Sequence, residues 1–291
     1  MSKAASFGKA LAVIRRVAVG TFNDGFIHAG NLAYLSMLAI FPFFILGAAL
    51  FDLIGGRENA EAMIDAVTRA LPESVASVIG PVAEDVIYAR SGTLLWIGAA
   101  VGLWTVSSLI ETIRDILRRA YRSPPVQAFW MTRLFSAGLI LAAVVVLMLS
   151  LFAQVVIGAA QEVILAAFPQ LAEFIAALSS ARIVPALGLA LSLWVLFATL
   201  TPVEHRKTRA PRWPGALFTT LWWIAVAIAL PVVLRAFFTY DLTYGSLAGS
   251  MVTLLFFWLV GLGLVIGAEL NAALALEGRS TASDEASEEK A

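Results

Sequence analysis

The chain has 291 residues, of which 60% are hydrophobic and 14% are charged, and its formal net charge is zero. Soluble domains carry about 25% charged residues, so this composition indicates a polytopic all-α membrane protein, in agreement with the mean hydropathy of +0.87. The zero net charge argues against nucleic acid as a partner, the absence of cysteine excludes disulfides and thiolate chemistry, and the two histidines are too few for a His-rich metal site. We therefore expect an integral membrane protein without a cofactor.

Residues 1–31 are predicted to form a cytoplasmic amphipathic segment. No uninterrupted apolar core precedes a small-residue cleavage site, so a cleavable signal peptide is not expected. Apolar residues recur there at helical spacing among basic ones: Phe7, Ala10, Leu11, Ile14, Val17 and Ala18, with Lys3, Lys9, Arg15 and Arg16 around them. Such a helix fits equally on an anionic membrane surface or against the cytoplasmic end of a helical bundle.

Six apolar segments follow, and about 20 helical residues are enough to cross a bilayer. They are residues 32–54, 93–110, 134–157, 183–200, 215–236 and 247–276. Together they predict a six-helix transmembrane domain over residues 32–276, and the polar tail 277–291 is expected to be disordered. The second segment should continue as a helix through ETIRDILRRAY. Lysine and arginine concentrate before the first span and in the second and fourth connecting loops, so the positive-inside rule places both termini in the cytoplasm of a bacterial inner membrane.

The outer loops 58–89 and 161–181 are predicted to contain short amphipathic helices. Apolar residues recur helically in both, and Pro72, Pro81 and Pro169 mark turns or kinks. These helices could lie at the outer interface, cap a cavity between the spans, or lie on the surface without a role in transport.

The last apolar segment is the one around which the chain is organised. Gly263 and Gly267 form a GxxxG step that lets a second helix approach closely. Asn271 lies about 40° from Gly267 around the helix and shares this seam, whereas Glu269 lies about 200° away and faces a different side. A carboxylate among small and apolar residues needs a partner. We expect a basic or hydrogen-bonding group at the cytoplasmic end of another span, Arg114 before Arg118.

Few other polar residues fall within or beside the spans. Asp24, His28 and Asn31 share one helix face near the cytoplasmic mouth, followed by Tyr34. This face could line a polar pathway, or it could serve interfacial solvation and capping.

The second span ends in a further polar group. Ser107 and Ser108 precede Glu111, which is paired with Arg114 at i+3. Glu111 lies nearest to the hydrocarbon and should face a partner or a cavity. A bridge from this level to Glu269 could be structural or could gate a pathway. No Walker A, G-x-S-x-G or H-E-x-x-H motif is present, so we expect a protein that is not an enzyme.

Four stretches of the chain resemble the YihY/BrkB inner-membrane proteins, a family once described as ribonuclease BN. The matching stretches are LAYLSMLAIFPFFI, LWTVSSLIETIRDILRRAY, RWPGALFTTLWW and the run from Tyr244-Gly245-Ser246 to the GAELNA element at residues 267–272. The chain departs from the family pattern at Gly30-Asn31 and at Arg119, which places it in a divergent branch. The resemblance implies a six-span inner-membrane fold and a role in the cell envelope.

Three functions follow from these observations. The first is transport or export of an envelope lipid or amphipathic solute, with membrane lipids as partners. The second is an assembly or scaffold role for another envelope system. The third is a tRNA-processing ribonuclease, which we do not favour, because metal-dependent RNA cleavage needs clustered His, Asp or Glu ligands. Nothing in the sequence fixes the oligomeric state.

Overall fold

The computed structural model describes residues 3–54, 64–65, 67–69, 71–89, 93–124, 130–142, 183–206, 211–237 and 247–288. This part of the chain is helical, and no strand occurs in it, as the composition and periodicity predict. The outer loop 161–181, most of the predicted third span and Tyr244 lie outside the described residues.

The N-terminal segment is joined to the first span without a break. Helix α1 (Lys3–Gly20) continues through a single π-helical stretch η1 (Thr21–Gly25) into α2 (Phe26–Ile54). The predicted boundary between residues 31 and 32 therefore does not coincide with a helix end. Glycine is a poor helix former, but Gly20 and Gly25 lie where this helix meets α12, as described below.

The remaining helices follow the predicted segments closely. They are α4 (Glu73–Ala89), α5 (Thr93–Ala120), the helix Trp130–Ala142, α8 (Ile183–Leu200), the short α9 (Val203–Arg206), α10 (Trp213–Phe237) and α12 (Ala248–Glu288). Helix α5 contains the expected continuation of the second span. The expectation of a disordered tail was wrong as far as Glu288, because α12 runs on into it. The tail contains no proline, and its alanine and glutamate residues favour a helix that has already been nucleated.

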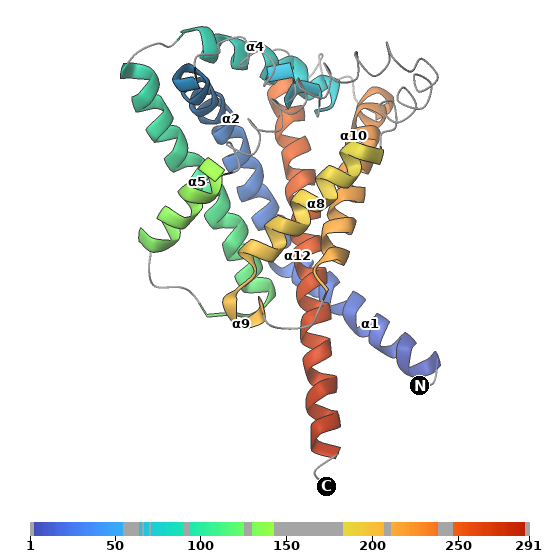
Figure 1. Ribbon diagram of the computed structural model, residues 1–291. Helices are drawn as coiled ribbons and strands as arrows, with labels where there is room; N and C mark the ends of the chain where they lie inside the picture. The colour runs from blue at the N-terminus through green and yellow to red at the C-terminus, as the bar shows by residue number, and fades with distance from the viewer. Residues whose placement is uncertain are drawn as a thin grey trace, which may run out of the picture.

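Helix α12 is the central element of the bundle (Figure 1). Its most apolar stretch is 56% buried, against 22–28% for the equivalent stretches of the other three helices that are long and apolar enough to cross a membrane. Those three are Ala10–Ile45, Trp96–Ala120 and Trp213–Leu234, and two shorter apolar helices, Trp130–Ala142 and Ala186–Leu200, accompany them. The described part of the chain thus contains four candidate spans, whereas six were predicted. The four candidate spans expose many apolar side chains, and such a surface is compatible with the hydrocarbon interior of a membrane.

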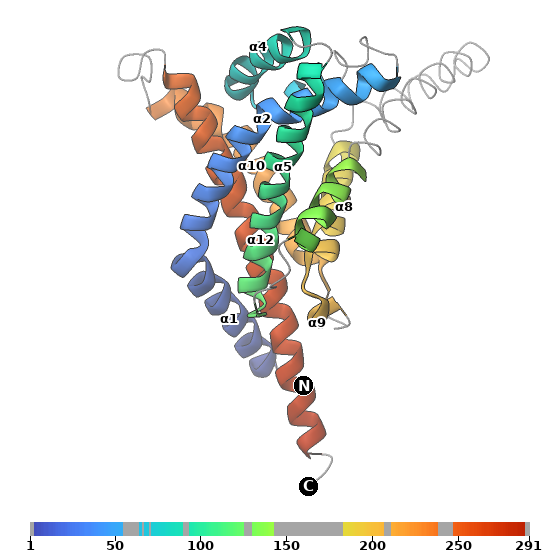
Figure 2. The ribbon, with the colours of Figure 1, turned by 90° about the vertical axis from the view of Figure 1, so that its left-hand side faces the viewer.

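The helix α4 closes one end of the bundle. It lies across α2 and α12, and it is on the opposite end from both termini and α9 in both views (Figures 1 and 2). Val75, Ile79 and Ala83 of α4 are buried in one apolar cluster with Phe44 of α2 and Phe256 of α12. This arrangement confirms the predicted amphipathic helix between Pro72 and residue 89, and it shows that this helix caps the bundle.

A second apolar cluster occupies the other half of the bundle, toward the termini. Leu117 of α5, Phe197 of α8 and Ala268 of α12 are almost completely buried in it. Both clusters include residues of α12, so this helix carries the packing from one end of the bundle to the other. Ile116, Ala120 and Val265 of this cluster also border the polar groups described next.

Candidate functional site

Two glycines lie where α1–η1 crosses over α12. A Cβ on Gly20 would lie 2.5 Å from the carboxyl carbon of Glu269, and a Cβ on Gly25 would lie 3.2 Å from Val265. Helices approach this closely only where one of them lacks side-chain atoms. The π-helical stretch η1 sits between the two glycines, and such local widening of a helix occurs frequently at functional sites.

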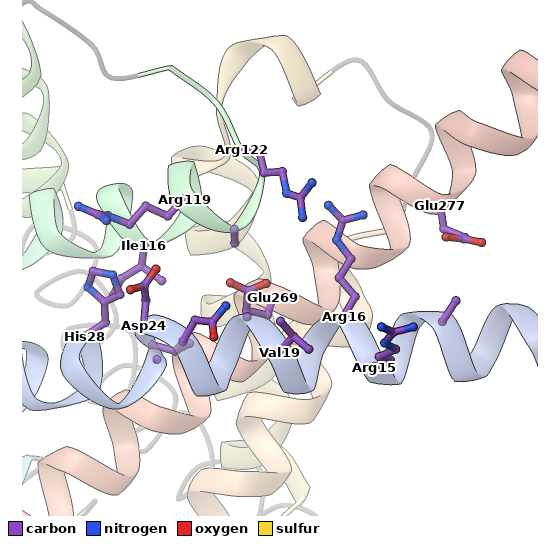
Figure 3. A pocket seen from close by; sticks show the side chains of 16 residues that line it. Arg15, Arg16, Val19, Asp24, His28, Ile116, Arg119, Arg122, Glu269 and Glu277 are labelled. Carbon is purple, nitrogen blue, oxygen red and sulfur yellow. The ribbon is translucent and has the colours of Figure 1, made fainter.

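A cavity of about 520 Å³ lies beside this crossing, and we call it the charged cavity (Figure 3). It is bordered by α1, η1, the start of α2, the end of α5 and α12. Its titratable lining residues are Arg15, Arg16, Asp24, His28, Arg119, Arg122, Glu269 and Glu277. Four arginines therefore face three carboxylates in a space where three candidate spans meet.

The charged cavity brings together three of the residues that the sequence singled out. Asp24, His28 and Glu269 line it from η1, α2 and α12. Asn31 and Tyr34 follow on α2 but are exposed and are not part of its lining, so the predicted polar face is divided. Asp24 and His28 support the interpretation of that face as a polar lining.

Arg114 was wrong as the named partner of Glu269, although a basic group at the end of the second span, Arg122, does face it. Arg114 is bound to Glu111 on its own helix, with its guanidinium nitrogen 3.1 Å from Glu111 Oε1. Glu269 instead faces Arg16 of α1 and Arg122, which follows α5, and both attract its carboxylate electrostatically. The error arose because helix periodicity fixes the side of α12 that Glu269 occupies but does not fix which helix lies on that side.

Glu111 forms the centre of a second polar cluster. Ser136 of the helix Trp130–Ala142 donates a hydrogen bond to Glu111 Oε1 at 2.7 Å, and Arg133 donates one to Ser108 Oγ at 2.9 Å. This cluster joins α5 to the next helix and agrees with the expectation that Glu111 faces a partner. Ser107 is also buried, but its hydroxyl donates to the Leu103 carbonyl of the same helix at 2.6 Å.

Two stacking contacts extend the Glu111 cluster. The Arg114 guanidinium lies 5.2 Å from the Phe135 ring centroid, and that of Arg133 lies 4.1 Å from the centroid of Trp104. Cation–π contacts of this kind stabilise arginine in partly dry surroundings. The cluster therefore holds α5 against the helix Trp130–Ala142. Arg114 belongs to this cluster and is not the partner of Glu269.

The predicted seam of α12 packs against α10. A Cβ on Gly267 would overlap Thr219 and the Gly215 carbonyl, and one on Gly263 would overlap Trp222. Asn271 lies on the same seam, as its position relative to Gly267 predicts, and its Oδ1 accepts a hydrogen bond from the Gly215 N–H at 2.8 Å. Gly215 belongs to the first turn of α10, where backbone N–H groups lack partners within the helix. Asn271 thus caps a neighbouring helix.

The segment that follows α5 contacts α9 through residues that the sequence did not place together. The Tyr121 ring lies 5.1 Å from the His205 ring, and Ser123 Oγ lies 3.4 Å from His205 Nδ1. Both rings are buried. Burial raises the pKa of the Tyr121 phenol above its ordinary value, so the phenol stays protonated.

Arg16 and Arg122 are the functional candidates that sequence reasoning missed. Arg16 was included only in the basic face of an amphipathic helix, and Arg122 only in a loop used to set topology. One local signal was available for the crossing, namely the glycine pair at residues 20 and 25 in an otherwise helical pattern. Within the described ranges, no three His, Cys, Asp or Glu side chains come together as a metal-binding group.

Comparison with known proteins gives the family. The model of the family described as virulence factor BrkB matches residues 20–291. A ribonuclease-like protein of Bacillus subtilis, YfkH, is 27% identical over 269 residues, covering 87% of this chain and 91% of that protein. The UPF0761 membrane protein PSHAa0171 of Pseudoalteromonas translucida is 24% identical over 258 residues, covering 86% and 81%. No solved structure matches. This chain is therefore a membrane protein of the YihY/BrkB family.

Proposed function

We propose that this protein transports or exports an envelope lipid or amphipathic solute. The observation that carries the proposal is the pair of hollows on the two sides of α1. The charged cavity lies on one side, and an apolar groove of about 400 Å³, lined by Val17, Phe22, Phe218, Ile266 and Leu270, lies on the other. An amphipathic molecule needs both environments, because its charged part is costly to bury in hydrocarbon and its apolar part is costly to expose to water.

The two hollows use adjacent faces of α12. Val265 and Glu269 line the charged cavity, whereas Ile266 and Leu270 line the apolar groove. The helix α1 separates them, and its last turn touches α12 through Gly20. A displacement of α1 would join the two spaces, and this motion is the step that we assign to substrate passage.

The proposal includes six spans in the bacterial inner membrane with both termini in the cytoplasm. The distribution of lysine and arginine supports this orientation. Both termini and α9, which ends at Arg206, also lie at the end of the bundle away from α4 (Figure 1). The charged cavity would then open toward the cytoplasmic leaflet.

The test is a flux measurement in liposomes that contain the purified protein. We expect fluorescent phospholipid to move between leaflets faster than in protein-free liposomes. Replacing Ile266 and Leu270 together by asparagine should slow this movement, whereas the exposed control Leu187→Asn on α8 should not. Protein that accelerates no member of a broad panel of lipids and amphipathic solutes would contradict transport. RNA cleavage by the same preparation, lost in Glu269→Gln, would favour a nuclease instead.

A further inference from the structure

Arg16 and Arg122 of the charged cavity differ from the three arginines of α5 in their ion pairs. Arg114, Arg118 and Arg119 each form a salt bridge with an acidic residue three or four positions earlier on α5. The salt bridges within 4 Å that the described residues form include neither Arg16 nor Arg122. These two side chains therefore have guanidinium hydrogen-bond donors available to a ligand.

Arg16 and Arg122 converge from different elements. Figure 3 shows their guanidinium groups turned toward one another above the carboxylate of Glu269. They lie near enough to repel each other electrostatically. Two like charges facing one space are unfavourable unless an anion lies between them. Guanidinium groups bind phosphate oxygens through paired N–H donors, and two arginines from separate helices suit such an anion.

The backbone at Arg122 supports a role for its side chain. Arg122 has φ 54°, the only positive φ among the non-glycine residues of the described part of the chain. The Ser123 N–H bonds to the Arg118 carbonyl at 2.9 Å, and the Arg122 N–H bonds to that of Arg119 at 3.0 Å. These two bonds close α5 with the motif that normally places glycine at the position of Arg122. A side chain at a strained backbone position is a reason to look for a function.

Glu269 is the internal competitor for the two arginines. Both arginines attract its carboxylate electrostatically. The carboxylate lies next to Gly20, in the space that a side chain at that position would occupy. The cavity also contains Asp24, Arg15, Arg119, His28 and Glu277, so the charges that face Glu269 come from every helix around it. A second anion placed between Arg16 and Arg122 would meet the negative charge of Glu269 directly.

We propose that the charged cavity binds a phosphate group between Arg16 and Arg122, and that Glu269 opposes its binding. The apolar residues Val19, Ile116 and Val265 line the same cavity, and they favour the phosphate of a lipid headgroup over a free phosphate compound. This inference rests on the proposed function and specifies its substrate class as an anionic phospholipid. Competition by Glu269 promotes release of the ligand. When the phosphate leaves, the Glu269 carboxylate takes its place as the anion that faces the two arginines.

The test is titration calorimetry of the full-length protein in a nonionic detergent. The probes are dihexanoyl phosphatidic acid, dihexanoyl phosphatidylcholine and glycerol 3-phosphate. We expect phosphatidic acid to bind more tightly than the other two, since phosphatidylcholine is zwitterionic and glycerol 3-phosphate has no acyl chains. Equal binding of glycerol 3-phosphate would overturn the lipid assignment, and equal binding of phosphatidylcholine would overturn the assignment of an anionic phospholipid as the substrate class.

Three variants should change the affinity for phosphatidic acid, two by lowering it and one by raising it. Arg16→Gln and Arg122→Gly should each weaken binding of phosphatidic acid by about tenfold or more, the loss expected for a charge-assisted hydrogen bond. Glu269→Gln should strengthen it. Arg69→Gln, an exposed arginine that pairs with Asp65 away from the cavity, is the charge-matched control and should bind as the wild type does. Weaker or unchanged binding to Glu269→Gln would overturn the proposed competition.

Arg122→Gly also separates binding from folding. Glycine is favoured at a positive φ, so this variant should melt no lower than the wild type while it loses affinity. A variant that loses neither stability nor affinity would overturn the role of Arg122. The liposome flux measurement is independent of these titrations: selective binding without flux would contradict transport alone, and flux without selectivity for anionic lipid would contradict this inference alone.

Discussion

Two glycines that contact α12, Gly20 of α1 and Gly215 of α10, show that the cost of a substitution depends on which atoms the new side chain meets. A Cβ on Gly20 would meet the carboxylate end of Glu269, which can rotate away. A Cβ on Gly215 would meet the backbone carbonyl of Gly267, which cannot move without shifting α12. The two positions are both helical glycines beside α12, so they form a matched pair.

We expect Gly20→Ala to be tolerated and Gly215→Ala to be destabilising. Alanine is favoured over glycine inside a helix by about 1 kcal/mol, and at Gly20 this gain should be retained because only a flexible side chain must move. At Gly215 overpacking should cost about 1–3 kcal/mol. Thermal unfolding in detergent measures the difference. Equal melting temperatures of the two variants would contradict the distinction between the two contacts.

Asn271 provides a second prediction at this scale. Asn271→Ala leaves the buried Gly215 N–H without its acceptor, and such a loss costs about 1–3 kcal/mol. Asn271→Asp keeps an acceptor beside the positive end of α10 and should lose less. The measurement is again the unfolding temperature, with Asn31→Ala, an exposed amide on α2, as the control. A loss at residue 31 as large as that at residue 271 would show that the cap contributes nothing specific.

The contact between α10 and α12 contains the closest glycine approaches among the described residues, at Gly215, Gly263 and Gly267. Thr219 donates a hydrogen bond to the Gly263 carbonyl at 3.2 Å, and Trp222 and Trp223 donate to the carbonyls of Leu259 and Val260 at 2.8 and 2.9 Å. Side-chain donors reach backbone carbonyls of another helix only when the two axes are close. The glycine seam therefore allows these hydrogen bonds to form, and close packing and hydrogen bonding together stabilise the contact between α10 and α12.

At the scale of this element, Gly267→Ala should destabilise the bundle and Gly267→Leu should do so more strongly. The added Cβ would overlap Thr219 and the Gly215 carbonyl, at a cost of about 1–3 kcal/mol for a single methyl group. Gly188→Ala on α8, where a Cβ meets nothing within 4 Å, is the control and should be neutral or slightly stabilising. Resistance to chemical unfolding in detergent is the measurement. A neutral Gly267→Leu would mean that this face of α12 is turned to lipid.

For the whole molecule, the arrangement of helices predicts the topology. Reporter tags at either terminus and in the loop before Trp213 should be found in the cytoplasm, and a tag next to α4 should be found outside. The continuity of α1, η1 and α2 adds a further expectation: a cysteine introduced at Phe22, which is exposed, should be labelled only by membrane-permeant or cytoplasmic reagents. A C-terminus accessible from outside would overturn both expectations.

The sequence by itself determined the features that depend on periodicity and composition. These include the membrane class, the near-exact limits of α8 and α10, the continuation of α5, the amphipathic α4 and the shared seam of Gly267 and Asn271. Each follows from spacing within one helix, because the angle between two side chains on a helix depends only on their separation along the chain. The resemblance of four stretches to the YihY/BrkB family was sufficient to identify the family.

Only the tertiary structure decided which helix meets each face. Glu269 was expected beside Arg114, but it faces Arg16 and Arg122, since α1 packs against α12 at Glu269. Asn271 was placed on the correct seam, but α10 as its partner and the cap on Gly215 were not predicted. Helix–helix pairing depends on the crossing geometry of elements that are distant in sequence, and a helical repeat contains no information about it. The charged cavity, built from three separate segments of the chain, is the consequence.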